Sequence, residues 1–153
     1  MILKTSYWAR HIPPDHVRIG ISRGSPRWMK AQPRIPELQP GQWLYTTEDP
    51  EEYRVRYVRQ LADLDPVRVV ERIRCEAGGK TPVLTCFCKP GGSNWCHRAW
   101  VSVWLAHRAG LHVPEFGMEA EGCAAEHPLL PAEYRRPVEQ PSTPARPVQL
   151  SLL

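Results

Sequence analysis

The residues of this chain with the greatest capacity for chemistry lie between positions 86 and 98. They are Cys86, Cys88, Lys89, Cys96, His97 and Arg98. Thiolates act as nucleophiles and as metal ligands, a neutral imidazole acts as a base or a ligand, and cationic side chains stabilise anions. The stretch therefore predicts a functional site, and three kinds of chemistry fit it.

Nucleophilic catalysis is the first kind. Cys96 stands near the start of a predicted helix and beside two cations, and both surroundings lower the pKa of a thiol. His97 cannot act as its base by adjacency alone, because successive helix positions point about 100° apart. A working pair requires that His97 face Cys86, or that His11 or His16 reach Cys96. The candidate catalytic residues are Cys86, Cys96, His97 and Arg98.

Metal binding is the second kind. Cys86 and Cys88 share one face of a predicted strand, because alternate strand residues point the same way. With Cys96 and His97 they form a four-ligand set that suits zinc. The spacing C-x-C-x7-C-H differs from the paired C-x-x-C pattern, and two consecutive ligands are awkward on a helix. On the sequence alone we therefore do not predict a cofactor, and a zinc ion held by these four residues is the alternative.

Anion binding is the third kind and the one that the sequence favours. Glycines and free amides at a helix start form a nest for phosphate, to which arginine and lysine add charge. Two tryptophans offer flat faces on which a base could stack. This interpretation predicts a nucleotide or a nucleic-acid phosphate as the ligand. Its residues are Arg23, Arg27, Trp28, Lys89, Gly91, Gly92 and Trp95, with Arg98 beside them.

An interpretation without chemistry also fits these residues. Cysteine is among the most buried residue types and behaves as a small apolar side chain, and tryptophan is a common core residue. Trp100 and Trp104, four positions apart, belong to the core in any interpretation. Cys75 and Cys123 have no partner in sequence and are expected to have no chemical role.

The elements that position the stretch follow from its apolar pattern. Residues 82–87 form a short apolar run between glycine-rich segments, which predicts a strand buried on both faces. A helix is predicted from about Trp95 to about Arg108, with Ser93 or Asn94 as its cap and Gly110 as its end. The loop between them then lies at the carboxyl end of the strand, where open α/β folds bind ligands.

The other elements predict an α/β fold. Residues 17–22 alternate apolar and polar side chains and predict a strand, while Asp49-Pro50 and Asp65-Pro66 each predict a helix start. The expected fold is a three-layer domain with a partly parallel sheet over residues 1–118. Prolines then dominate, and residues 119–148 are predicted to be a flexible tail. The expected buried helix faces are Tyr53, Tyr57 and Leu61 with Val58 beside them, and Val67, Val70 and Ile73 or Arg74.

Composition narrows the class of protein further. The chain has 153 residues, enough for one domain, and no apolar run of the roughly 20 residues that a membrane helix needs. Its start lacks the layout of a signal peptide, and its five cysteines are an odd number, so we expect a cytoplasmic protein without a membrane role. The net charge is +4, with an excess of arginine in the first third. Arginine suits phosphate recognition and is also an ordinary surface cation.

Several segments resemble a bacterial family called domain of unknown function 488. They are residues 21–28 (ISRGSPRW), 51–57 (EEYRVRY), 64–66 (LDP), 83–89 (VLTCFCK) and 95–98 (WCHR), in that order, and the resemblance extends over roughly residues 1–117. Members of that family often have an acidic residue where this chain has Cys88. The resemblance implies an α/β fold and a site of Cys86, Cys96, His97 and Arg98, but it supplies no activity.

A second resemblance covers five residues. Gln149, Leu150, Ser151, Leu152 and Leu153 are similar to the pentapeptide with which bacterial replication and repair proteins bind the DNA sliding clamp, with leucine in place of the usual final phenylalanine. The sequence therefore predicts a DNA-metabolism accessory protein that acts on a nucleotide, base or phosphate and is recruited by this peptide. The alternative is a zinc- or thiol-dependent enzyme that acts on a small molecule and has no DNA role.

Overall fold

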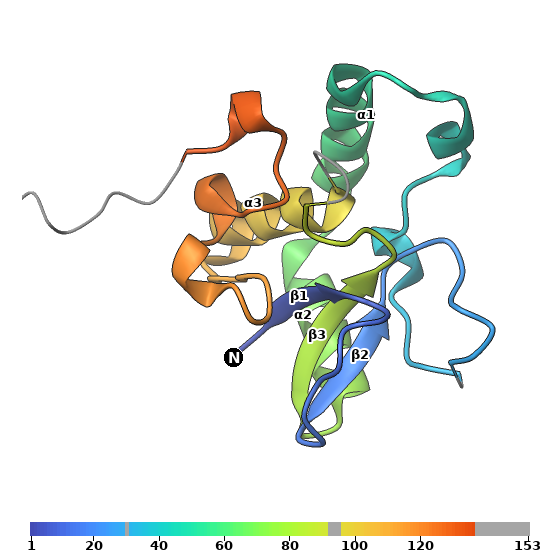
Figure 1. Ribbon diagram of the computed structural model, residues 1–153, viewed down its shortest axis with the longest axis vertical. Helices are drawn as coiled ribbons and strands as arrows, with labels where there is room; N and C mark the ends of the chain where they lie inside the picture. Colours follow the sequence, from blue (N-terminus) through green and yellow to red (C-terminus); the bar gives the residue numbers. More distant parts are fainter. Residues whose placement is uncertain (30, 92–95, 137–153) are drawn as a thin grey trace, which may run out of the picture.

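The computed structural model describes residues 1–29, 31–91 and 96–136 as an α/β domain (Figure 1). Its sheet has three strands, β1 (Lys4–Tyr7), β2 (His16–Gly20) and β3 (Thr81–Cys86), in the order β1-β3-β2. Both neighbours pair with β3 in parallel. The α/β class and the parallel pairing predicted from the sequence are confirmed.

The central strand β3 positions the site. Val83 pairs with Lys4 on one side and with Arg18 on the other, and both Val83 and Leu84 are fully buried. A strand covered on both faces accounts for the continuous apolar run in the sequence. The strand ends at Cys86, one residue earlier than predicted, and Phe87 beyond it is 53% exposed.

Helices α1 (Pro50–Ala62) and α2 (Pro66–Ala77) begin where the sequence predicts. The side chain of Asp49 accepts a hydrogen bond from the amide of Glu52, and that of Asp65 accepts one from the amide of Val67. Each cap satisfies an amide that has no partner within the helix, and proline follows at a position that needs no donor.

The predicted buried face agrees better with the structure for α1 than for α2. Tyr53, Tyr57 and Leu61 of α1 are buried as expected, whereas Val58 is 40% exposed. On α2 the buried stripe is Val69, Ile73 and Ala77, spaced by four residues. The prediction for α2 was right for Ile73 and wrong for Val67, which is 72% exposed, because three valines in the first turns offer several apolar faces and only packing selects one.

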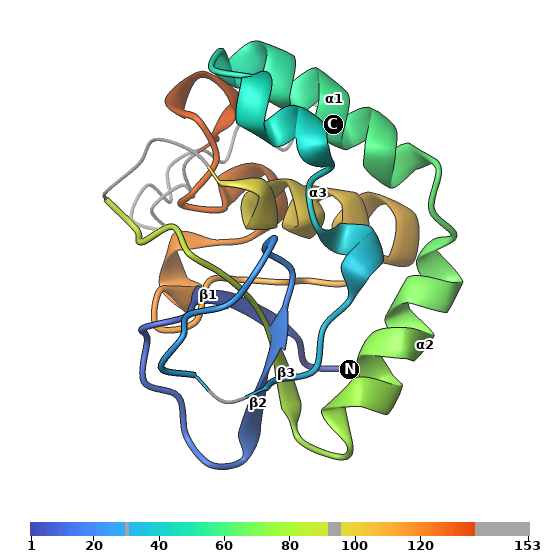
Figure 2. The same cartoon turned by 90° about the vertical axis from the view of Figure 1, so that its right-hand side faces the viewer.

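Helix α3 (His97–Ala109) lies between α1 and the sheet, with α2 alongside the strands (Figure 2). Trp100 and Trp104 are buried in the core, as predicted. The residue before the helix, Cys96, is extended (φ −155°, ψ 145°), so α3 begins about two residues later than the sequence suggests. The expected caps Ser93 and Asn94, and Trp95, lie outside the described residues.

The chain after α3 packs on the domain as far as residue 136. Short 3-10 helices cover residues 119–121, 124–126 and 132–134, and Leu129 and Leu130 join the hydrophobic core. The side chain of Ser102 in α3 fastens this segment, donating to the carbonyl of Val113 and accepting from the amide of Ala124. The packed region therefore continues past residue 118, where the sequence places the start of the tail. Residues 137–153, including the pentapeptide, lie outside the described part of the chain.

Within the described ranges, every helix is too short or too polar to cross a lipid bilayer.

Candidate functional site

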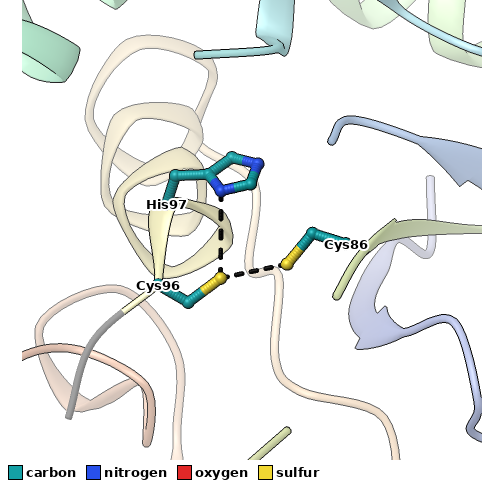
Figure 3. Close-up of side chains that lie close together, drawn as sticks. All are labelled: Cys86, Cys96 and His97. Carbon is teal, nitrogen blue, oxygen red and sulfur yellow. Dashed lines mark hydrogen bonds between the residues drawn. The ribbon is translucent and has the colours of Figure 1, made fainter. Parts of the chain in front are cut away.

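Two thiols and an imidazole meet where β3 ends and α3 begins (Figure 3). Cys86 is the last residue of the strand, Cys96 directly precedes the helix, and His97 is its first residue. The sulfur atoms of Cys86 and Cys96 are 3.0 Å apart, and Nδ1 of His97 is 3.9 Å from the Cys96 sulfur. All three residues are buried, and their ligating atoms lie within 4.8 Å of one another. We call this group the Cys–Cys–His cluster.

The orientation of His97 is fixed from outside the cluster. Its Nε2 lies 2.8 Å from the carbonyl oxygen of Ile21, so Nε2 carries the proton and donates it to that oxygen. Nδ1 is therefore unprotonated and faces the sulfur of Cys96 (Figure 3). Burial lowers the pKa of His97, which keeps the ring neutral.

Cys96 and His97 face each other although they are adjacent in sequence. If both residues belonged to the helix, their side chains would diverge by about 100°, but α3 begins only at His97. Because the backbone of Cys96 is extended, its thiol turns back toward the imidazole of His97. The two histidines named as substitutes are not needed, and His16 lies at the amino end of β2, paired with Asp15.

The guanidinium of Arg98 lies beneath the sulfur atoms. Its Nη1 donates to the sulfur of Cys86 at 3.0 Å, to the carbonyl of Cys88 at 2.6 Å and, at 3.5 Å, to the sulfur of Cys96. Burial opposes ionisation of Cys96, but hydrogen bonds from the thiols of Cys86 and Cys88 and the charge of Arg98 together lower its pKa well below the usual range. Arg98 therefore donates hydrogen bonds to both sulfurs and favours the thiolate form of Cys96.

A buried polar network holds Arg98, and the sequence did not reveal it. Glu115 accepts from Nε and Nη2 of Arg98 at 2.9 and 2.7 Å, and also from the hydroxyl of Thr5 at 2.8 Å. Nδ1 of His127 accepts from the amide of Leu129, so its Nε2 carries the proton and donates to Thr5. These residues are widely separated in the chain and no spacing links them, so only the fold brings them together.

Cys88 lies beside the cluster. It is half-buried, and hydrogen bonds with the thiols of Cys86 and Cys96 are the main reason that its pKa is raised. The strand ends at Cys86, so the alternation that would place Cys86 and Cys88 on one face stops before Cys88. The structure thus brings together three of the four predicted zinc ligands closely, with the fourth thiol adjacent.

A cavity of about 350 Å³ opens onto the cluster. Its volume is within the range of pockets that bind small molecules. The residues that line it come from the end of β2, the segment before α1, helix α1 and the β3–α3 loop. They are Ser22, Arg23, Pro40, Leu44, Tyr45, Tyr53, Cys86, Phe87, Cys88, Cys96 and His97.

Most of the described residues that were predicted to bind an anion lie away from the cavity. Among those that the structure describes, only Arg23 lines the cavity that holds the cluster. Arg27 and Lys89 are exposed, Trp28 is 65% exposed, and none of these three borders that cavity. Gly91 has the positive φ expected of a nest (82°) but borders a separate hollow with Arg135. Gly92 and Trp95 lie outside the described residues.

Comparisons of the chain with protein-family models, with curated proteins and with solved structures find no match. The family resemblance stated from the sequence therefore stays a prediction.

Replacing Glu115 tests the buried pair with Arg98. Glu115→Gln leaves the guanidinium without a countercharge in a fully buried position, and we expect a loss of about 3–5 kcal/mol in the free energy of unfolding. The measurement is urea denaturation followed by circular dichroism. The matched control is Glu119→Gln, which removes the half-exposed partner of Lys4 and should cost no more than about 1 kcal/mol. Equal losses in the two variants would contradict the role assigned to Glu115.

The burial of His127 predicts that the folding stability of the protein decreases at acid pH. Burial lowers its pKa to about 3, so the ring is neutral in the folded state and its contact with Glu115 is not an ion pair. Because the folded pKa lies below the unfolded pKa, the contribution of His127 to stability is complete above about pH 6.5 and is lost as the pH falls toward about 3.

The wild-type chain should therefore lose about 2 kcal/mol more than His127→Gln between neutral pH and about pH 5. Urea denaturation across this range measures the difference, and the exposed His107→Gln serves as the control that should follow the wild type. Parallel pH profiles for wild type and His127→Gln would overturn this prediction.

Proposed function

We propose that this protein is a zinc-dependent enzyme that acts on a small molecule, with Cys86, Cys96 and His97 as the zinc ligands. The single observation that carries the proposal is the position of the Cys–Cys–His cluster. Its three ligating atoms lie within 4.8 Å of one another, and all three residues line the same cavity. A ligand set beside a cavity is the arrangement that a catalytic metal needs.

The types of the ligands favour zinc. Two thiolates and one neutral imidazole form a soft to borderline donor set, which suits zinc and does not suit magnesium or calcium. Bond lengths of about 2.3 Å to sulfur and 2.0–2.1 Å to nitrogen place tetrahedral ligands about 3.8 Å apart for two sulfurs and about 3.6 Å for sulfur and nitrogen. The two sulfurs are 3.0 Å apart, Nδ1 of His97 is 3.9 Å from the Cys96 sulfur, and all three ligating atoms lie within 4.8 Å of one another, so the ligands would need to move by roughly 1 Å to hold zinc.

The surroundings of the ligands also fit a metal site. Metal-bound histidines usually donate their second N–H to a backbone carbonyl or carboxylate, as His97 does to Ile21. Two thiolates balance the charge of a divalent ion. Arg98 adds no net charge, because Glu115 holds it in a bidentate pair. A zinc ion in the cluster would thus complete a site that is electrically neutral as a whole.

Three protein ligands are typical of a catalytic zinc, because a fourth position remains for water or substrate, whereas four ligands close a structural site. Cys88 decides between the two arrangements, since its thiol borders both the cluster and the cavity. With its fourth position open to the cavity, the ion would supply a Lewis acid that polarises the substrate and activates water. A metal-free chain would instead leave Cys96 and His97 as a thiol–imidazole pair, the arrangement of a thiol-dependent enzyme and the alternative to a zinc-dependent one.

Metal analysis tests the proposal. The purified chain should contain about one zinc per molecule, because each of the three residues supplies one ligand atom. Cys86→Ser and Cys96→Ser should each lose most of this zinc, while Cys75→Ser, which changes an exposed thiol on α2 that does not line the cavity, should retain it. Atomic emission measures the ratio, and circular dichroism confirms that each variant is folded.

Cys88→Ser separates the two kinds of zinc site. If the fourth position is open, this variant keeps its zinc, whereas a closed site would lose affinity for the ion. A zinc content near zero in the wild-type chain, prepared without chelator and after incubation with zinc, would sink the proposal.

A second function is favoured by the sequence alone. The pentapeptide of residues 149–153 resembles a ligand of the bacterial sliding clamp, and we propose that it recruits the domain to replicating DNA. Short peptides of this kind bind in an extended form and need no folded domain around them. This proposal is independent of the zinc site, because it concerns where the enzyme acts and not what it does.

Deleting residues 149–153 should abolish binding to a purified bacterial sliding clamp, and replacing Gln149 and Leu152 together with alanine should have the same effect. Fluorescence anisotropy with the labelled clamp measures the affinity. Gln140→Ala changes a glutamine upstream of the motif and is the control that should bind like the wild type. Retention of binding after the deletion would remove the recruitment function.

A further inference from the structure

The mouth of the cavity carries two exposed aromatic side chains. Tyr45 is 70% exposed and Phe87 is 53% exposed, and both line the cavity whose deeper residues are the thiols and His97. Exposed aromatic rings around a pocket offer flat faces on which a ring of a ligand can stack. The entrance of the cavity is therefore lined in part by two aromatic rings.

Among the lining residues that the structure describes, one side chain, that of Arg23, is a cation. Arg23 places its guanidinium 5.7 Å from the centre of the Tyr45 ring, and its Nη1 donates to the carbonyl of Pro40 at 3.2 Å. These two contacts hold the side chain at the mouth. Within the described part of the chain no carboxylate forms an ion pair with Arg23, and no aspartate or glutamate lines the cavity.

The charge of the cavity follows from this arrangement. A guanidinium with no carboxylate partner beside an apolar cavity attracts an anion, and its planar fork suits a carboxylate or a phosphate. Two other polar groups that line the cavity already have hydrogen-bond partners. Ser22 accepts from the indole of Trp8 and donates to the carbonyl of Gly24, and His97 is bound to Ile21. Arg23 is thus the group that can select a ligand by its charge.

From these observations we infer that the cavity binds a small organic anion with a flat ring, whose anionic group pairs with Arg23 and whose ring stacks on Tyr45 or Phe87. A volume of about 350 Å³ accommodates one or two rings. In the proposed enzyme this class of molecule is the substrate, so in that respect the inference rests on the proposed function. The binding itself involves only side chains of the chain and does not require the metal.

Two sources share this chemistry, an aromatic carboxylic acid and a phosphate monoester such as a nucleotide. Both contain a ring and an anionic group, and they differ in the charge and size of that group. The experiment therefore uses separate arms for benzoate, phenyl phosphate and a purine nucleoside monophosphate. Benzyl alcohol, which is neutral, and cyclohexanecarboxylate, which is not flat, test the charge and the ring separately.

Isothermal titration of the full chain with each compound gives the dissociation constants. We expect binding of at least one of the three aromatic anions, with benzyl alcohol and cyclohexanecarboxylate at least about tenfold weaker. Arg23→Gln should weaken the bound anion by about tenfold or more and leave benzyl alcohol unchanged. The matched control is Arg27→Gln, which removes an exposed arginine from the same segment but not from the cavity.

Phe87→Leu and Tyr45→Leu test the ring. At least one of them should weaken the aromatic anion more than it weakens cyclohexanecarboxylate, because only the flat ring loses a stacking partner. The preferred arm identifies the source, carboxylate or phosphate.

Three outcomes would overturn the inference: no aromatic anion binds, Arg23→Gln has no effect beyond that of Arg27→Gln, or the neutral and non-flat compounds bind equally well. Zinc analysis of the same sample separates the two proposals. Zinc without anion binding would remove the inference and leave the zinc enzyme, whereas anion binding without zinc would do the reverse.

Discussion

The ion pair between Arg98 and Glu115 is the interaction on which the rest of the site depends. Both side chains are fully buried, and the guanidinium is held through two hydrogen bonds to the carboxylate. Burying either charge alone would cost several kcal/mol, so each residue stays inside only because the other is there. The third face of the guanidinium is then free to donate to the sulfurs of Cys86 and Cys96. One buried pair thus connects the end of β3, the start of α3 and the segment that follows α3.

This pair also explains why the chain after α3 packs on the domain. Glu115 reaches Arg98 from a segment that runs beside β1, and the hydroxyl of Thr5 and the ring of His127 complete its hydrogen bonds. Leaving any of these buried polar groups without a partner would cost about 1–3 kcal/mol. The segment up to residue 136 is therefore fixed by polar contacts as well as by Leu129 and Leu130 in the core. A proline-rich composition did not prevent this packing, because the contacts need no regular secondary structure.

The two halves of the cavity have different chemistry, and the proposed function uses both. Its floor consists of two sulfur donors and one nitrogen donor, and Arg98 donates hydrogen bonds to the two sulfurs. Its mouth consists of two aromatic rings and one arginine: Arg23 follows β2, Tyr45 belongs to the segment before α1, and Phe87 follows β3. In small-molecule sites the reacting groups commonly lie at the floor of the cavity and the groups that recognise the ligand lie at its mouth, because catalysis and specificity require different side chains.

The sequence by itself determined the α/β class, the capped helices, the buried central strand and the stretch in which the site lies. These features depend on local patterns, such as Asp-Pro at a helix start or a short apolar run between glycines, and such patterns are visible in neighbouring residues. The tertiary structure alone decided which side chains of that stretch act together. Because the backbone of Cys96 is extended, its thiol faces His97. Arg98 is buried in an ion pair with Glu115, whereas Arg27 and Trp28 are exposed at the surface. Contacts between residues such as Thr5, Glu115 and His127 have no sequence pattern, because they are selected by the need to satisfy buried charge and polarity across the fold.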